Sequence, residues 1–268
     1  QVPTTFPPTI VVRGDCGCLR LQPQAGTVAD AIIRNNVCLG NYDPPHTSST
    51  AGAVGMLVFG AVSHPTFENN AVAEVNGACF DFQHVSGTSA TVRNNATDDC
   101  ALAVSGICGG GGVCNLWWDS NSTAPTLDHN VWWAATSGTQ VIKGPSSACT
   151  RSTAATCDTT AVVADPLFVS TSDLHLQSTS TLRDAGTNTG CSGTTDIDGE
   201  MRPINTTCDI GVDELQAAGA TPSPTPTGTP VLTSTPPNPT ITPTVVPTAT
   251  VTATPVATVT PTLTPTPV

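Results

Sequence analysis

The chain has 268 residues and is acidic, with 20 aspartates and glutamates against 8 lysines and arginines and a formal net charge of −12. Nucleic acids and anionic membranes attract proteins through basic patches, so this charge argues against both as partners. It also disfavours polyanionic substrates unless a metal ion bridges the charges. No apolar run is long enough to span a bilayer, so we predict no transmembrane segment.

The first residues have the composition of an extended segment. Residues 1–15 contain the run Val2-Pro-Thr-Thr-Phe-Pro-Pro-Thr9, and closely spaced prolines favour extended backbone. We interpret Gln1 as the start of a mature chain from which a signal peptide has been removed. The predicted location is therefore secreted, at the cell surface or in the extracellular space.

Residues 16–164 contain an internal repeat. Four segments share an apolar residue, a charged residue, Asn or His, Asn and a small apolar residue; they lie at 31–37, 65–71, 90–96 and 125–131. An apolar run precedes each segment, at 18–21, 56–59, 78–82 and 115–118. One such unit cannot bury its own apolar face, so the units must stack. The repeat predicts an all-β fold, a short parallel β-solenoid.

The second Asn of each segment predicts a hydrogen-bonded ladder formed by Asn36, Asn70, Asn95 and Asn130. Asn tolerates the left-handed backbone of a tight corner, and stacked amides satisfy one another when they are buried. The alternative is a β-sandwich in which the repeat is accidental. The unequal steps of 34, 25 and 35 residues favour the solenoid, because an insertion in one loop leaves its register intact.

The chain has 11 cysteines and no zinc-ligand spacing, which predicts disulfides and an oxidising compartment. Short loops favour three pairs, although the sequence leaves the connectivity open: Cys108 with Cys114, Cys149 with Cys157, and Cys191 with Cys208. The odd count leaves at least one thiol free or paired between chains. N-glycosylation sequons begin at Asn95, Asn121 and Asn205, and chance occurrence is the alternative explanation for them.

No residues form a recognisable catalytic motif, so we assign no catalytic residues and predict no enzyme activity. Arg34 and Arg93 are of the residue type that serves as base in lyases, but the sequence shows no partners around them. The Asp98-Asp99 pair could chelate a metal ion or act as paired acids, and a solvated turn is the favoured alternative. Asp196 and Asp198 are a weak calcium candidate, since the full twelve-residue loop is absent and a structural turn is the alternative. We therefore predict no cofactor, with calcium as the alternative.

Two tryptophan pairs are the candidate glycan-binding residues: Trp117, Trp118, Trp132 and Trp133. In a strand, one member of each pair points inward and the other outward. Outward rings would stack on sugars, whereas inward rings would fill the core. Both interpretations stay open at the level of the sequence.

Residues 165–219 carry an ordered series of motifs that includes Asp165-Pro-Leu-Phe168, Asp173-Leu-His-Leu176, Asp196-Ile-Asp-Gly199 and Cys208-Asp-Ile-Gly211. The series resembles the closing segment of bacterial surface proteins with a choice-of-anchor C-terminal region. The Asn-Asn corners resemble those of secreted right-handed parallel β-helix proteins of the pectate-lyase-like superfamily. Thr181 and Asp213 depart from the pattern, which has Pro and an aromatic residue there.

The resemblance implies a right-handed parallel β-helix and secretion, but no particular activity. Exposed strand edges at the end of a solenoid must be covered, so we expect residues 165–219 to cap one end of the stack. An ion pair between Arg202 and Asp196 or Asp198 would lock this closing segment.

Residues 220–268 are uncharged and rich in Pro and Thr, a composition typical of extended, O-glycosylated stalks. The alternation in Thr248-Ala-Thr-Val-Thr-Ala-Thr254 also suits a strand added to a neighbouring copy. The sequence therefore predicts a non-enzymatic extracellular structural protein, displayed or assembled into filaments through this tail. Its expected partners are copies of itself or the cell envelope. The alternative is a carbohydrate-active enzyme or glycan-binding module that uses the β-helix groove.

Overall fold

The computed structural model describes residues 17–22, 27–40, 54–75, 77–85, 89–100 and 114–216. In these ranges the chain is mostly β-structure, with one short 3₁₀-helix and one short α-helix. None of the helices described is long and apolar enough to cross a membrane. The extended segment predicted for residues 1–15 and the stalk predicted for residues 220–268 lie outside the described residues.

The strands of the first part of the chain follow the sequence repeat. Repeat 1 contains β1 (Gly17–Leu21), β2 (Val28–Ala29), β3 (Ile32–Arg34) and β4 (Val37–Leu39). Repeat 2 contains β5 (Val54–Phe59), β6 (Val62–Ser63), β7 (Thr66–Glu68) and β8 (Ala71–Ala73). Repeat 3 contains β9 (Phe80–Gln83), β10 (Thr91–Arg93) and β11 (Ala96–Asp98). Repeat 4 contains β12 (Leu116–Trp118), β13 (Thr126–Asp128) and β14 (Val131–Trp132).

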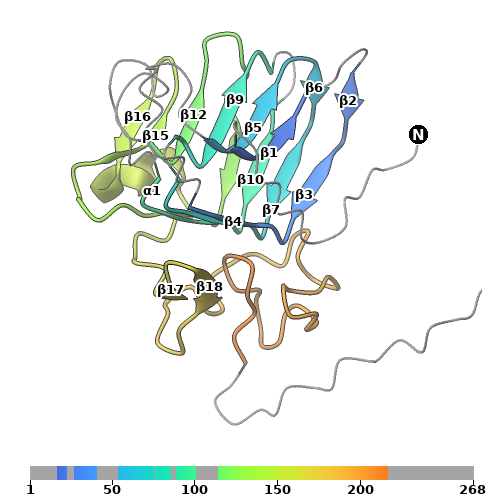
Figure 1. Cartoon of the computed structure of the whole chain (residues 1–268), viewed down its shortest axis with the longest axis vertical. Coiled ribbons are helices and arrows are strands. Elements are labelled where there is room, and N and C mark those ends of the chain that lie inside the picture. The colour runs from blue at the N-terminus through green and yellow to red at the C-terminus, as the bar shows by residue number, and fades with distance from the viewer. Residues whose placement is uncertain are drawn as a thin grey trace, which may run out of the picture. The chain divides into compact units, whose positions relative to one another are not determined.

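Equivalent strands of successive repeats pair in parallel, as Figure 1 shows. One sheet has the order β1-β5-β9-β12 and continues with β15 (Gln140–Lys143) and β16 (Ala148–Thr150). A second and a third sheet, of four strands each, have the orders β13-β10-β7-β3 and β14-β11-β8-β4. In addition, β2 pairs with β6. The residues that follow the four Asn positions are direct cross-strand partners: Val37, Ala71, Ala96 and Val131. These stacked parallel sheets are compatible with a β-helix-like fold.

A residue with left-handed backbone links the second and third sheets in every repeat. Asn35, Asn69, Asn94 and His129 have φ values of 54°, 54°, 52° and 52°. Asn and His are among the few residues other than Gly that adopt this region readily. The chain therefore turns at the first residue of each Asn-Asn pair, and the second residue points into the stack.

The core consists of alternate strand residues that point between the sheets. Phe67 packs edge-to-face on Phe80 and Phe82, with ring centroids 5.7 and 5.5 Å apart. Phe80 meets Trp132 in the same geometry at 6.2 Å. Each of these four side chains is at most 1% exposed. Side chains from three repeats therefore share one apolar interior, and this burial provides the main driving force for stacking.

Residues that follow repeat 4 cover its end of the stack. β16 pairs antiparallel with β15, and η1 (Arg151–Thr153) and α1 (Ala154–Cys157) come directly after it. Val162 then forms an isolated parallel bridge with Val131 of β14. The parallel stack thus ends in a strand of opposite direction and a helical turn.

The C-terminal segment, residues 165–216, lies along the side of the stack and does not cover an end. It contains β17 (Phe168–Ser170) and β18 (Asp173–Leu176), which form an antiparallel pair. Phe168, Leu174 and Leu182 share an apolar cluster with Ala71 and Ala96, which lie on the face of their sheet that points away from the main core. Small alanines leave that face flat, so the larger side chains of the C-terminal segment can cover it.

Candidate functional site

The side chains of Asn36, Asn70, Asn95 and Asn130 form a ladder along the inside of the stack. Each Nδ2 donates to the Oδ1 of the next residue, at 2.9, 2.9 and 3.0 Å. The same Oδ1 atoms accept the backbone N–H of the preceding ladder residue. Asn70, Asn95 and Asn130 are fully buried. A buried amide without partners costs about 1–3 kcal/mol, so mutual pairing is what makes these polar side chains tolerable inside the stack.

Asp158 continues the ladder beyond the last Asn. Its Oδ2 accepts Nδ2 of Asn130 at 3.1 Å and Nε1 of Trp132 at 3.0 Å, and the residue is 1% exposed. It lies after α1, outside the repeat, so no sequence pattern pointed to it. The short helical turn thus places a carboxyl oxygen as hydrogen-bond acceptor at the end of the ladder.

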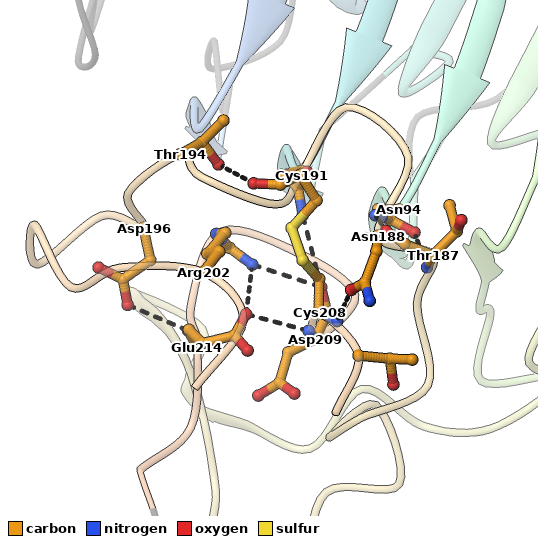
Figure 2. Close-up of a disulfide and its surroundings, with 12 residues drawn as sticks. Asn94, Thr187, Asn188, Cys191, Thr194, Asp196, Arg202, Cys208, Asp209 and Glu214 are labelled. Carbon is orange, nitrogen blue, oxygen red and sulfur yellow. Dashed lines mark hydrogen bonds and ion pairs between the residues drawn. A yellow bond between two sulfur atoms is a disulfide. The ribbon is translucent and has the colours of Figure 1, made fainter. Parts of the chain in front are cut away.

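The first residue of each Asn-Asn pair holds the C-terminal segment. Nδ2 of Asn35 donates to the carbonyl of Thr195, and Nδ2 of Asn69 lies 3.4 Å from the carbonyl of Gly211. Asn94 is bound twice to the backbone of Thr187, at 2.7 and 2.8 Å, a contact that Figure 2 shows. The two residues of each pair therefore have different roles: one docks the C-terminal segment and the other joins the repeats.

Four disulfides connect described residues. Cys149 bonds to Cys157 and Cys191 to Cys208, and Figure 2 shows the second of these. Cys18 bonds to Cys38 and Cys79 to Cys100; these two pairs were not anticipated, because their partners are 20 and 21 residues apart. Cys114 is disulfide-bonded. Cys108 lies outside the described residues, so its predicted pair with Cys114 stays a prediction.

Arg34 and Arg93, which the sequence left without partners, lie on either side of Glu68. The register aligns the three residues across β3, β7 and β10. Nη2 of Arg34 is 2.6 Å from Oε1 of Glu68, and Nη2 of Arg93 is 2.7 Å from Oε2. The backbone of Gly190 packs closely against this group. Any larger residue would not fit there, because its Cβ would lie 2.3 Å from Nη2 of Arg93. Both arginines are thus structural ion-pair partners.

The predicted pairing of Arg202 with Asp196 or Asp198 is wrong. Arg202 pairs with Glu214 at 3.0 Å, and both side chains are fully buried; Figure 2 shows the pair. Asp196 instead accepts backbone N–H groups, from Asp198 and Glu200 through Oδ1 and from Glu214 through Oδ2. It organises a turn, while Asp196, Asp198 and Glu200 still bring one carboxylate oxygen each within 4.8 Å of one another.

Asp98 and Asp99 make different contacts. Oδ1 of Asp99 accepts the N–H of Ala135 at 2.7 Å. Asp98 lines a pocket of about 240 Å³ between β8, β11 and the C-terminal segment, together with Glu74 and Asp165. Burial, helped by the charges of Asp99, Asp165 and Glu74, raises the pKa of Asp98 to about 7. The pocket therefore combines three carboxyl groups with an apolar wall.

The four tryptophans do not form one platform. Trp118 and Trp132 are 7% and 1% exposed, so their rings belong to the core. Trp117 is half-buried against Ala78 and Cys114. Trp133 packs on the cluster under the C-terminal segment, and the Arg151 guanidinium lies 4.2 Å from its ring centroid. Only Trp117 and Trp133 keep part of their surface accessible.

The sequons differ in accessibility. Asn95 is fully buried and its amide belongs to the ladder, which excludes a glycan there in the folded protein. Asn121 and Asn205 are exposed and remain candidate sites.

No protein-family model matches the chain, and no curated protein or solved structure proves similar to it. The resemblance to the pectate-lyase-like superfamily and to choice-of-anchor segments therefore stays a prediction from the motifs.

Proposed function

We propose that the protein is a secreted, non-enzymatic structural protein, a short right-handed parallel β-helix presented outside the cell by residues 220–268. The observation that carries this proposal is the Asn ladder. It runs through all four repeats and ends on Asp158. The polar residues inside the stack are thus engaged in joining one repeat to the next, which is what a rigid scaffold needs.

The disulfides support the extracellular part of the proposal. Cys18–Cys38 and Cys79–Cys100 each connect residues some twenty positions apart within the stack, and Cys191–Cys208 fastens the C-terminal segment. Such bonds persist in oxidising compartments and not in a reducing cytosol. Cross-links of this kind stabilise a small domain by restricting its unfolded chain.

We propose that assembly involves the tail and not end-to-end stacking of repeats. β15 adds one more parallel strand to β12, but β16 then pairs with β15 in the antiparallel direction and Val162 bridges β14. The parallel register therefore stops at this end. Electron microscopy and sedimentation velocity of the purified full chain test this point, with a chain ending at residue 219 as control. Regular filaments that disappear in the shorter chain support assembly through the tail. Monomers of both chains refute it.

A glycan-binding function is the alternative, and the partly accessible rings of Trp117 and Trp133 favour it. Incubation with neutral and acidic polysaccharides, with and without calcium, distinguishes the two functions. Depolymerisation would overturn the non-enzymatic proposal. Retention on a polysaccharide that is lost in Trp117→Ala or Trp133→Ala, but kept in Trp132→Phe, would identify a binding module.

A further inference from the structure

Three metal-ligating side chains from distant positions meet in the C-terminal segment. His175 lies on β18, Asp198 in the turn that Asp196 organises, and Asp213 close to the end of the described chain. One ligand atom from each lies within 4.8 Å of the other two. Nε2 of His175 is 3.2 Å from Oδ2 of Asp198, a separation suited to two ligands of one ion.

A further carboxylate orients the imidazole. Nδ1 of His175 is hydrogen-bonded to Oδ1 of Asp173, which keeps the proton of a neutral ring on Nδ1. The lone pair of Nε2 then faces the carboxylate of Asp198. Two electron-rich atoms at this distance repel each other unless a proton or a metal ion lies between them. Metal-ligating histidines commonly use a carboxylate on the opposite nitrogen in this way.

Asp213 adds a buried negative charge that is poorly compensated. It is 7% exposed, and within residues 114–216 only the Leu176 N–H donates a hydrogen bond to it. Arg202 does not compensate this charge, because its guanidinium pairs with Glu214.

We propose that His175 Nε2, Asp198 and Asp213 bind a divalent transition-metal ion, with water completing its coordination. One imidazole with two carboxylates suits zinc and its neighbours in the first transition row. Calcium prefers oxygen ligands alone, which the adjacent group of Asp196, Asp198 and Glu200 offers. The imidazole is therefore the feature that decides between the two kinds of ion.

The ion would fasten three parts of the C-terminal segment to one another. The Arg202–Glu214 pair and the Cys191–Cys208 disulfide already hold the same region. A metal ion at His175 extends this clamp to β18, and thus to the strand pair that packs on Ala71 and Ala96. The proposal concerns stability and is independent of the function proposed above.

The test uses the full chain after treatment with EDTA, with zinc chloride as the probe. Isothermal titration calorimetry should show one zinc ion per chain. Thermal unfolding should shift upward by about 5–10 °C when zinc is 100-fold above its Kd. Asp198→Asn is the mildest ligand variant, because its side chain is 57% exposed, and it should weaken zinc binding at least tenfold. His175→Gln should abolish binding.

Two further variants separate ligation from folding. Asp173→Asn leaves all three ligands in place and removes only the carboxylate that orients the ring, so zinc affinity should fall about 10–100-fold. His129→Gln is the matched control. His129 also contacts a neighbouring carboxylate, at 2.6 Å from Asp128, but it belongs to none of the ligand groups in the described residues. Its zinc affinity should equal that of the unmodified chain.

Several results would overturn the proposal. If zinc produces neither heat in the calorimeter nor a rise in the unfolding temperature, His175 is joined to the carboxylates by a proton alone and there is no metal site. Zinc binding that survives in His175→Gln assigns the ion to another group. Calcium bound more tightly than zinc, and unaffected by His175→Gln, places the cation at Asp196, Asp198 and Glu200.

Discussion

Replacing Asn95 by Ala removes the middle of the Asn ladder. The Asn95 Nδ2 donates to Oδ1 of Asn130 at 3.0 Å and to the carbonyl of Phe67 at 3.0 Å. Its Oδ1 accepts both the backbone N–H and the Nδ2 of Asn70, at 3.0 and 2.9 Å. Asn70, Asn95 and Asn130 are fully buried, so water cannot replace the lost partners without entering the stack.

The expected loss of stability follows from the groups left without partners. The truncation deprives the backbone N–H of Asn70 of its acceptor and the carbonyl of Phe67 of one donor. It also removes the side-chain hydrogen bonds that join Asn95 to Asn70 and to Asn130. At about 1–3 kcal/mol for each of these two buried groups, we expect a loss of about 2–6 kcal/mol. Typical domains are stable by about 5–15 kcal/mol, so the variant should be close to its folding threshold.

Asn36→Ala is the matched control at the open end of the ladder. Asn36 is only half-buried and donates to Asn70 and to the Arg34 carbonyl, but no described residue donates to its Oδ1. We expect a loss of about 1 kcal/mol. Guanidinium unfolding with the disulfides intact, in protein made without glycans, measures both losses. Equal losses in the two variants, or less than about 1 kcal/mol for Asn95→Ala, would refute the ladder as the main polar stabiliser.

Two other side chains yield predictions of the same kind. Glu68→Gln should lower the free energy of unfolding in urea by about 2–3 kcal/mol, because it leaves the two flanking, partly exposed arginines without their buried counter-charge. Asp128 is the cross-strand neighbour of Arg93 on the other side, and Asp128→Asn should lower the same free energy by less than about 1 kcal/mol. Burial raises the pKa of Asp81 from 3.8 to about 7. A hydrogen bond from Gln83 lowers this pKa, and the charge of Asp119 raises it further. The proton on Asp81 therefore adds stability that is complete below pH 3.8 and is lost as the pH rises through about 7. At about 1.4 kcal/mol per pH unit the full effect is at most about 4 kcal/mol. Asp98 and Asp209 have similarly raised pKa values, so in Asp81→Asn the fall of unfolding free energy with pH should become shallower by the share of Asp81 and should not vanish. An unchanged slope would refute the buried, protonated acid.

Long-range contacts decided features that no short sequence pattern contains. Asp158 reaches the end of the ladder only because α1 folds over repeat 4. Glu68 lies between its two arginines because register, and not sequence distance, makes them neighbours. His175, Asp198 and Asp213 are separated by 23 and 15 residues and meet only when the C-terminal segment folds back on itself.

The sequence by itself determined the repeat, the strand-forming segments and the polar positions within them. These features are local: an apolar run, a residue that tolerates left-handed backbone, and an Asn beside it are visible in a single repeat. The sequence also identified the second member of each Asn-Asn pair as the ladder residue. Tertiary structure decided that the first member binds the C-terminal segment, and it placed that segment along the side of the stack. That placement depends on Ala71 and Ala96 forming a flat outer face, which exists only once the strands of successive repeats lie next to one another.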